Sequence, residues 1–439
     1  MFGKHAGEIM FLETLRIQNI RSIADIAVDF ADRSVSEPAV RKWSLLVGQN
    51  GTGKSTILKA AALLLAGSDA LPDLVRDPKE WVRNGESAGR ISGRLRTQDW
   101  EPRDISLDIV SADGRSDILK RNDAGLAALD QALSHASQNY FTAAYGPYRR
   151  VSDDSRALST GQLPRANCLT TLFDKNAVVY PLATWAMSLD YQLGEDGLGI
   201  VRKALDDLLP GIQFSGIDKG QGRLLFQTDD GIVPLDQLSD GFQNVAAWIG
   251  DLLYRITEAF AHRRDPLKAR GLLLIDEIDA HLHPAWQRRL REFLTTTLPN
   301  FQIVATTHSA LTLQQAKQDE TIILSRDANR RVLAAPFPGD PSKLRLHQLY
   351  DLAFRISSLD SWEIEQNKEI YRDLSAKPAA ALTPEEVSAL ESARQTLELV
   401  PESKVDGLGN EALESYFTKL SSAVDALERS APGQVRAVE

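Results

Sequence analysis

An eight-residue glycine-rich loop constrains this chain more than any other feature of its sequence. Residues 48–55 read GQNGTGKS and match the spacing G-x-x-x-x-G-K-[S/T]. The glycines let the backbone turn tightly and point its N–H groups toward one centre, where phosphate oxygens can bind. An apolar, strand-like run at 43–47 precedes the loop, and a helical run at 54–65 follows it. This order of strand, loop and helix predicts an α/β nucleotide-binding core.

The loop also predicts which groups bind the ligand. Lys54 should reach the β- and γ-phosphates, while the Ser55 hydroxyl should bind Mg²⁺. We therefore expect ATP and Mg²⁺ as ligands. The residues expected to contact the nucleotide are Asn50, Gly51, Thr52, Gly53, Lys54, Ser55 and Thr56.

Two adjacent acids end an apolar strand far along the chain. The run LLLI at 272–275 leads directly into Asp276 and Glu277. If this strand lies beside the phosphate loop, Asp276 would bind Mg²⁺, and Glu277 would orient and deprotonate the attacking water. The alternative is that the two acids merely cap a buried strand. The presence of the phosphate loop favours the catalytic interpretation.

A second anion site is predicted N-terminal to these acids. The sequence LSDG at 238–241 comes just before a long amphipathic helix at 242–261. The hydroxyl of Ser239, the backbone of Gly241 and the helix N-terminus can together bind a phosphate. An ordinary N-cap formed by Ser239 or Asp240 is the alternative. A similar LSTG at 158–161 lacks this context, and we interpret it as a chance match.

Histidines follow the two apolar strands predicted at 272–275 and 302–306. His308 follows the apolar strand at 302–306, where its ring can hydrogen-bond the γ-phosphate and sense its loss. We predict this role for His308 rather than a purely structural one. His281 and His283 are separated by one residue, but neither a cysteine nor another cluster of candidate ligands supports a metal site there. Asp279 is instead expected to contact a dimer partner.

The composition narrows the class of protein. The net charge of -10 argues against indiscriminate nucleic-acid binding but leaves a local basic face open. Cys168 is the sole cysteine, so no intrachain disulfide can form, and a reducing compartment fits best. Apolar runs such as 60–66 are too short to cross a bilayer. We expect a cytoplasmic protein that does not bind a membrane.

The remaining segments predict the organisation of the chain. Alternating apolar residues at 11–17, 23–30, 90–95 and 105–110 indicate strands of an antiparallel lobe, with a hairpin turn at Asp113-Gly114. We expect an ATPase head at 1–337 with a mainly helical insertion at about 150–211, followed by a helical domain at 338–439. Within that domain, TPEE at 383–386 is a capping box. Strands are also expected at 212–214, 223–227, 231–234, 271–275 and 322–325.

Together, these motifs resemble those of the ABC-type ATPases of the SMC/RecF/OLD group. The resemblance rests on the phosphate loop, LSDG, LLLIDEIDAHLHP at 272–284 and TTHS at 306–309, and spans about residues 11–325. It implies a mixed sheet with flanking helices and an antiparallel β lobe. It also implies that two heads meet head to tail around ATP, so that Ser239 and Gly241 act on the nucleotide held by the partner.

The same resemblance extends to the N-terminal segment NIRS at 19–22. It assigns Arg21 and Ser22 to contacts with the nucleotide base and phosphates. The glutamine that contacts the metal in this group has no identifiable counterpart here, and Gln138 is a weak candidate for it.

Within the group, the chain is similar to compact ATPases of bacterial anti-phage defence, including the Septu type. The similar segments are YGPYRR at 145–150, PLDQLSDG at 234–241, DEIDAHLHPAWQ at 276–287 and the helical stretch 371–400. This implies a sensor or regulatory subunit that works with a separate nuclease, such as an HNH nuclease, and that forms a dimer or a higher oligomer. No acidic toprim-like cluster follows the ATPase motifs, so we expect no nuclease activity from the chain itself.

Two other functions remain open from the sequence. A RecF-like DNA-repair ATPase would bind duplex DNA, and the basic residues to watch are Arg149, Arg150, Arg288, Arg289 and Arg291. Solvated helix charge is the expected role of these arginines. A transporter ATPase subunit is the second alternative. The long span between Lys54 and Ser239 and the helical C-terminal segment count against it.

Overall fold

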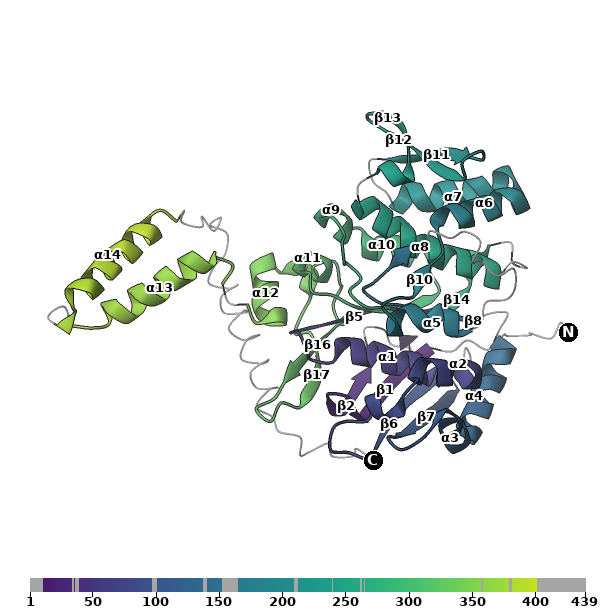
Figure 1. The fold of residues 1–439 in the computed structure, drawn as a ribbon, viewed down its shortest axis with the longest axis horizontal. Coiled ribbons are helices and arrows are strands. Elements are labelled where there is room, and N and C mark those ends of the chain that lie inside the picture. The colour runs from purple at the N-terminus through teal and green to yellow at the C-terminus, as the bar shows by residue number, and fades with distance from the viewer. Residues whose placement is uncertain are drawn as a thin grey trace.

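A six-stranded sheet forms the centre of the molecule (Figure 1). The computed structural model describes residues 11–33, 35, 39–96, 101–136, 140–151, 165–208, 212–238, 240–260, 263, 265–356, 358–378 and 381–400. The strand order is β17-β16-β5-β15-β14-β8, and every neighbouring pair is parallel except β16 with β17. These strands are β5 (Trp43–Gly48), β8 (Tyr140–Tyr145), β14 (Arg270–Ile275), β15 (Phe301–Thr306), β16 (Thr321–Arg326) and β17 (Val332–Pro336).

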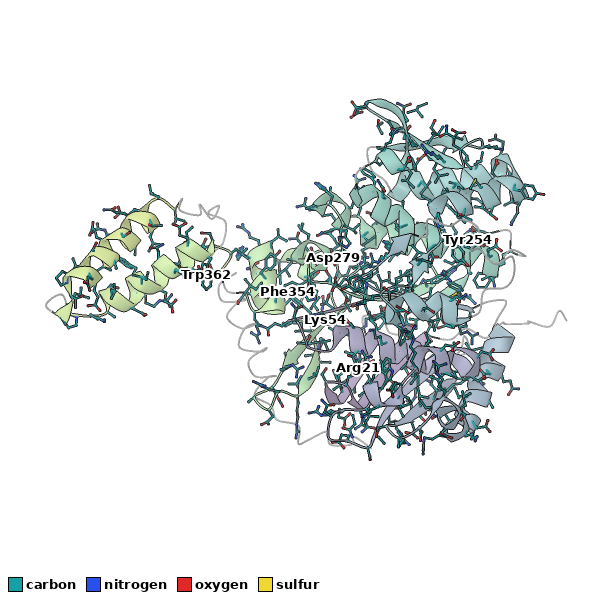
Figure 2. The ribbon with its side chains drawn as sticks, in the orientation of Figure 1. Arg21, Lys54, Tyr254, Asp279, Phe354 and Trp362 are labelled. Carbon is teal, nitrogen blue, oxygen red and sulfur yellow. The ribbon has the colours of Figure 1, made fainter. Side chains whose placement is uncertain are left out.

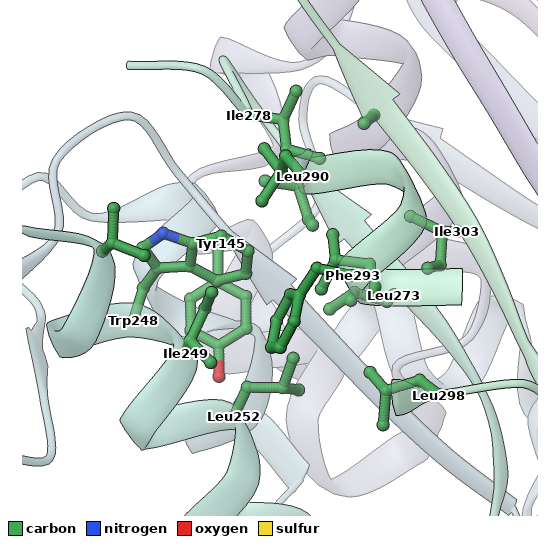
Figure 3. Packing of buried hydrophobic residues seen from close by; sticks show 14 of the residues in the cluster. Tyr145, Trp248, Ile249, Leu252, Leu273, Ile278, Leu290, Phe293, Leu298 and Ile303 are labelled. Carbon is green, nitrogen blue, oxygen red and sulfur yellow. The ribbon is translucent and has the colours of Figure 1, made fainter. Parts of the chain in front are cut away.

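Both faces of this sheet are covered by helices, as expected for parallel strands with continuous apolar runs. Alternate side chains of β5 point to opposite faces: Leu45 and Val47 join the core around α8 (Asp240–Ala259), whereas Leu46 joins the core around α1 (Lys54–Leu64). Figure 3 shows the first of these cores, in which Tyr145 lies beside Trp248 of α8.

The second sheet is antiparallel and lies against the α1 side. Its order is β2-β1-β6-β7, formed by β2 (Ile23–Asp29), β1 (Phe11–Ile20), β6 (Ala88–Arg96) and β7 (Pro102–Val110). Buried Gln302 of β15 joins the two sheets, because its side-chain amide accepts from the Leu12 N–H and donates to the Leu12 carbonyl, both at 2.8 Å. The mixed central sheet, its flanking helices and this antiparallel lobe form the arrangement that the sequence predicts.

Smaller elements complete this lobe. They are β3 (Ala31–Asp32), β4 (Ala39–Val40), α2 (Gly67–Val75), η1 (Pro78–Glu80), α3 (Arg115–Arg121) and α4 (Asp123–Ala136). The predicted hairpin turn at Asp113-Gly114 is wrong. Gly114 is the N-cap of α3, and its N–H donates to Asp117 Oδ2 at 3.1 Å. An Asp-Gly pair is compatible with both a hairpin turn and a helix start, because in each case the chain turns away from the preceding strand.

The predicted insertion is mainly helical. Its later helices pack on the α8 side of the central sheet, whereas Leu169 and Leu172 of its first helix lie in the core around α1. Trp185, Leu189 and Val201 are buried in the same core as Trp248. Its elements are β9 (Arg150–Val151), α5 (Arg165–Phe173), β10 (Val178–Val179), α6 (Leu182–Leu193) and α7 (Glu195–Leu208). A three-stranded sheet and a short helix follow: β11 (Gln213–Asp218), β12 (Arg223–Thr228), β13 (Gly231–Pro234) and η3 (Leu235–Gln237).

The C-terminal part begins with short helices that belong to the head. Leu349 and Leu352 of α12 (Leu346–Phe354) are buried in the core around α8. The remaining short helices of the head are η4 (Pro266–Lys268), α9 (Pro284–Gln287), α10 (Leu290–Thr297), α11 (Ala310–Leu313) and η5 (Pro341–Lys343). Among the described residues, no helix is both long enough and apolar enough to cross a membrane.

Two further helices form a hairpin that extends away from the head (Figure 1). They are α13 (Trp362–Ser375) and α14 (Pro384–Glu398), and they pack against each other. The predicted capping box is present, since Thr383 Oγ1 accepts from the Glu386 N–H and a Glu386 carboxylate oxygen accepts from the Thr383 N–H. Trp362 at the start of α13 is 78% exposed, and Leu399 at the end of α14 is 84% exposed.

Gly48 is the position where the fold tolerates a side chain least. Its φ is +142°, and an added Cβ would lie 2.2 Å from the Leu324 carbonyl oxygen of β16. We predict that Gly48→Ala lowers the free energy of unfolding by about 3 kcal/mol or more, through combined backbone strain and overpacking. Denaturant titration measures this loss. Gly85→Ala is the matched control, because Gly85 also has positive φ but an added Cβ meets no described atom within 4 Å. Equal losses in the two variants would contradict the role assigned to the close approach.

Candidate nucleotide-binding and hydrolysis site

The phosphate loop joins β5 to α1 and leaves the helix N-terminus open. Gly53 is the N-cap of α1 in a left-handed conformation, with φ of 91°, and no side chain caps the first turn. The N–H groups of that turn are therefore available to an anion. Ser55 is exposed beside them, whereas Thr52 and Thr56 are buried. This arrangement fits a triphosphate with a cation bound at Ser55.

Lys54 lies folded over the loop. It is 6% exposed, and its Nζ donates to the carbonyls of Gly48 and Gln49 at 2.8 and 2.9 Å. Burial lowers the pKa of Lys54 to about 8, although the carboxylates of Asp276 and Glu277 oppose the shift. These same electrostatic contributions show that the ammonium lies close to both predicted catalytic acids. Figure 2 shows Lys54 near the centre of the head.

Asp276 and Glu277 follow β14 at the edge of the sheet where the phosphate loop lies. β14 pairs with β15, and β15 pairs with β5, so all three strands end together. Asp276 is 4% exposed, and its N–H donates to the Tyr145 carbonyl at 2.8 Å. The strand that carries the two acids therefore ends at the same sheet edge as the phosphate loop.

The Thr306 side chain links the two acids. Its hydroxyl donates to Asp276 Oδ1 and accepts from the Glu277 N–H, both at 2.7 Å. Glu277 has φ of 48°, which is rare for a residue with a side chain and is common at functional sites. Thr306 is a site residue that the sequence did not predict, although the TTHS motif contains it. A hydroxyl at the end of a strand next to the acids was the available signal.

His308 lies two residues beyond Thr306, and its side chain is exposed. Partial burial lowers the pKa of His308, and the positive charge of Lys54 adds to this effect, while the carboxylate of Glu277 opposes it. The ring is therefore neutral at physiological pH and lies within electrostatic range of both groups. His308 follows β15, whose end lies at the same sheet edge as the phosphate loop and the second acid.

Asp279 has a partner within its own chain. The Thr307 hydroxyl donates to its carboxylate, and burial raises the pKa of Asp279. The expected contact of Asp279 with a second subunit remains a prediction. His283 accepts from the Ala285 N–H as the N-cap of α9. Among the described residues, no group of three His, Cys, Asp or Glu side chains could hold a metal ion.

Arg21 and Ser22 form the turn between β1 and β2, next to the phosphate loop. An added Cβ at Gly53 would contact the Ile23 side chain and lie 3.9 Å from Ser22 Oγ. The Arg21 guanidinium lies 4.1 Å from the centre of the Trp81 ring, and burial lowers its pKa. The turn therefore borders the loop, while the Arg21 side chain packs on Trp81.

The predicted signature segment lies only partly within the described residues. Ser239 is outside them, and so is Gln138, the candidate for the metal-contacting glutamine. Gly241 is in the first turn of α8. Near it, the Phe242 ring packs edge-on against Trp286 of α9 at 4.3 Å.

Two of the arginines that were expected to be solvated instead make contacts within the protein, one at the candidate site and the other in a mostly buried ion pair. Arg149 Nη2 donates to the carbonyls of Asp276 and Glu277, at 2.9 and 2.8 Å. Arg291 pairs with Glu320, and both side chains are mostly buried. The expectation of solvated helix charge is therefore wrong for these two residues. The sequence signal was their position just after strands and helices of the site rather than their charge.

Two family models match this chain. Residues 10–113 match "AAA ATPase domain", and residues 188–314 match "AAA domain, putative AbiEii toxin, Type IV TA system". The first match contains the phosphate loop and the second contains the signature segment and the two acids. AAA domain models thus match two separate parts of this chain, and together these parts contain every motif predicted to bind or hydrolyse the nucleotide, including TTHS at 306–309, which lies inside the second match.

Proteins similar in sequence to this chain include Septu and retron proteins. The chain is 27% identical to Septu protein PtuA of Bacillus mycoides over 74% of this chain and 42% of the relative. It is 34% identical to the Retron Ec83 probable ATPase of Escherichia coli over 27% of this chain and 22% of the relative. A second Septu protein PtuA, of Bacillus thuringiensis, is 32% identical over 34% of this chain and 37% of the relative. The chain thus matches less than half the length of each of these relatives.

Solved structures with a similar fold include an SMC head bound to the C-terminal winged-helix domain of ScpA. It has a TM-score of 0.43 and 15% identity, over 74% of this chain and 98% of that chain. The recombination mediator RecF with ATP has a TM-score of 0.34 and 15% identity, over 68% of this chain and 93% of that chain. Likeness at this level supports no inference about function.

The Thr306 hydroxyl generates a prediction about turnover. We expect Thr306→Val to lower kcat about 10- to 100-fold, the scale of a misplaced catalytic group, while the Kd for ATP changes less than about threefold. Steady-state turnover and fluorescent-nucleotide titration measure the two quantities. Thr321→Val is the matched control, because the buried Thr321 hydroxyl has no partner among the described residues. Unchanged kcat in Thr306→Val would contradict the bridging role.

Proposed function

We propose that this protein binds and hydrolyses ATP as a head-to-tail dimer and acts as the sensor or regulatory subunit of a bacterial defence complex. The observation that carries the proposal is the meeting of the open phosphate loop, Lys54 and the acids Asp276 and Glu277 at one edge of the sheet. Defence is supported by the Septu and retron relatives.

Asp276 and Glu277 would have different roles in hydrolysis. The Asp276 carboxylate is buried and accepts from Thr306, so it suits a fixed cation ligand together with the Ser55 hydroxyl. When bound there, Mg²⁺ would neutralise charge on the β- and γ-phosphates. Glu277 is more exposed, and its backbone is fixed at its N–H by Thr306 and at its carbonyl by Arg149. Its carboxylate would accept the proton of the attacking water.

The other predicted contacts surround the triphosphate. Lys54 would leave the loop carbonyls for the β- and γ-phosphates, and the loop residues Asn50, Gly51, Thr52, Gly53 and Thr56 would enclose them. Neutral His308 would donate a hydrogen bond to the γ-phosphate and lose it after hydrolysis. Arg21 and Ser22 would contact the nucleotide from the turn beside the loop.

Ser239 and Gly241 would act on the nucleotide of a second subunit. Gly241 lies in the first turn of α8, where the helix dipole favours a phosphate, and Ser239 comes just before this helix in the sequence. The active site would therefore be complete only in a dimer, with Asp279 at or near the contact between the subunits.

A separate nuclease, such as an HNH nuclease, would be the effector. The hairpin of α13 and α14 could contact such a partner, because it exposes Trp362, Val387 and Leu399. The alternative of duplex-DNA binding gains little from the antiparallel lobe. Its arginines are neutralised by neighbouring aspartates in the pairs Arg16–Asp25, Arg90–Asp108 and Arg94–Asp104.

Substitutions of the loop lysine and the second acid test the proposed chemistry. We expect Glu277→Gln to keep ATP affinity and to lose turnover by about two orders of magnitude or more, the scale of general-base catalysis. Lys54→Ala should lose ATP binding itself, because it removes the charge that faces the phosphates. Nucleotide titration and phosphate release measure the two effects. Equal loss of binding in both variants would overturn the assignment of Glu277.

Mixed dimers test action in trans. We expect Ser239→Arg to abolish hydrolysis, while the fold and monomeric ATP binding remain. Mixing Ser239→Arg with Lys54→Ala should restore partial turnover, because one of the two sites in each mixed dimer then has every functional group. Phosphate release is measured on the mixture, and heterodimers are verified with two affinity tags. Absence of rescue in verified heterodimers would count against a shared site.

A further inference from the structure

Arg149 occupies the edge of the central sheet beside the two acids. It follows β8, the strand that pairs with β14, so the C-terminal end of β8 lies next to Asp276. Arg149 Nη2 donates to the carbonyls of Asp276 and Glu277, and Arg149 Nε donates to the Gly146 carbonyl at 3.1 Å. One guanidinium therefore holds the backbone of both acids, using the fixed donor geometry that distinguishes arginine from lysine.

The same guanidinium also contacts the helix that begins at the signature segment. Its central carbon lies 4.9 Å from the centre of the Trp248 ring. Trp248 is fully buried on α8, and its ring lies 5.7 Å from that of Tyr145 at the end of β8 (Figure 3). Arg149 is thus packed between α8 and the catalytic acids, so a displacement of either one changes the contacts of the other.

A buried polar network fixes α8 to the same strand end. The Tyr145 hydroxyl and Arg255 Nε each donate to Asp251 Oδ2 at 2.6 Å, and the Tyr180 N–H donates to Asp251 Oδ1. Asp251 and Arg255 are 0% and 4% exposed at their side chains. Such a satisfied network resists local rearrangement, because each unpaired group would be left without a partner in a low-dielectric interior. The helix and the strand end therefore move together.

Glu277 is the element that this connection would adjust. Its strained backbone is fixed on one side by Thr306, which belongs to β15, and on the other by Arg149. Thr306 belongs to the central sheet, whereas Arg149 also contacts Trp248 of α8, so Arg149 connects α8 directly to the Glu277 carbonyl.

We propose that Arg149 is a positioning residue that couples the signature helix α8 to Glu277, so that docking of the signature segment on a partner's nucleotide aligns the general base. The proposal rests on the proposed ATPase function. It assigns to the segment after β8 a link between subunit contact and chemistry, in a chain without an identifiable metal-contacting glutamine.

A double-mutant cycle with Arg149→Ala and Trp248→Phe tests the coupling in the full chain. We expect Arg149→Ala to lower kcat about 100-fold, as for a misplaced catalytic group, with the Kd for ATP within about threefold. Trp248→Phe should lower kcat less, because phenylalanine offers a weaker face to a cation. The double variant should be no slower than Arg149→Ala alone, since the two residues act through one contact. Phosphate release and nucleotide titration provide the measurements.

Two further variants separate the positioning role of Arg149 from a general effect of lost positive charge or lost folding. Arg202→Ala removes an exposed arginine of α7 and should leave kcat unchanged. If Arg149→Ala does not fold, Arg149→Lys takes its place in the cycle, because lysine keeps the charge but cannot bridge both carbonyls and cover the ring. Multiplicative losses in kcat, or wild-type turnover in the Arg149 variant, would overturn the coupling alone. Absence of turnover in the wild-type protein would overturn the proposed function and the coupling with it.

Discussion

The hydrogen bonds of the Thr306 hydroxyl are the interaction on which the site depends. Three parallel strands end at one edge of the sheet, and this hydroxyl fixes the two acids of one strand from its neighbour. Parallel pairing places the phosphate loop, the acids and His308 within reach of one ligand. Without the cross-strand bridge, the Glu277 N–H would lose its hydrogen bond, and the carbonyl contacts from Arg149 and the Ala280 N–H would remain.

The sequence predicted the parts of the site that depend on local chain geometry. The phosphate loop needs only a strand, a glycine turn and a helix, so residues 48–55 and the adjacent elements could be identified from eight consecutive positions. The acids were recognised because they end an apolar run. Their proximity to the phosphate loop was inferred on the condition that the two strands are neighbours. In the structure β15 lies between β5 and β14, and the three strands end at the same edge of the sheet.

What the sequence could not provide depends on contacts distant along the chain. The strand β8 was not predicted, because its run YFTAAY is short and less apolar than its neighbours, and Arg149 was therefore treated as surface charge. Its role is visible only when β8 pairs with β14. The same limit applies to Asp113-Gly114, where a turn signal is compatible with a helix start.

The amide of Gln302 has a consequence for motion within the head. It replaces a rung of backbone pairing between the antiparallel lobe and the central sheet, and it is buried with both its donor and its acceptor used. A hinge between the two sheets at this point would leave the amide and the Leu12 backbone without partners. Hinge motion between the two sheets at this point is therefore opposed by the loss of two buried hydrogen bonds.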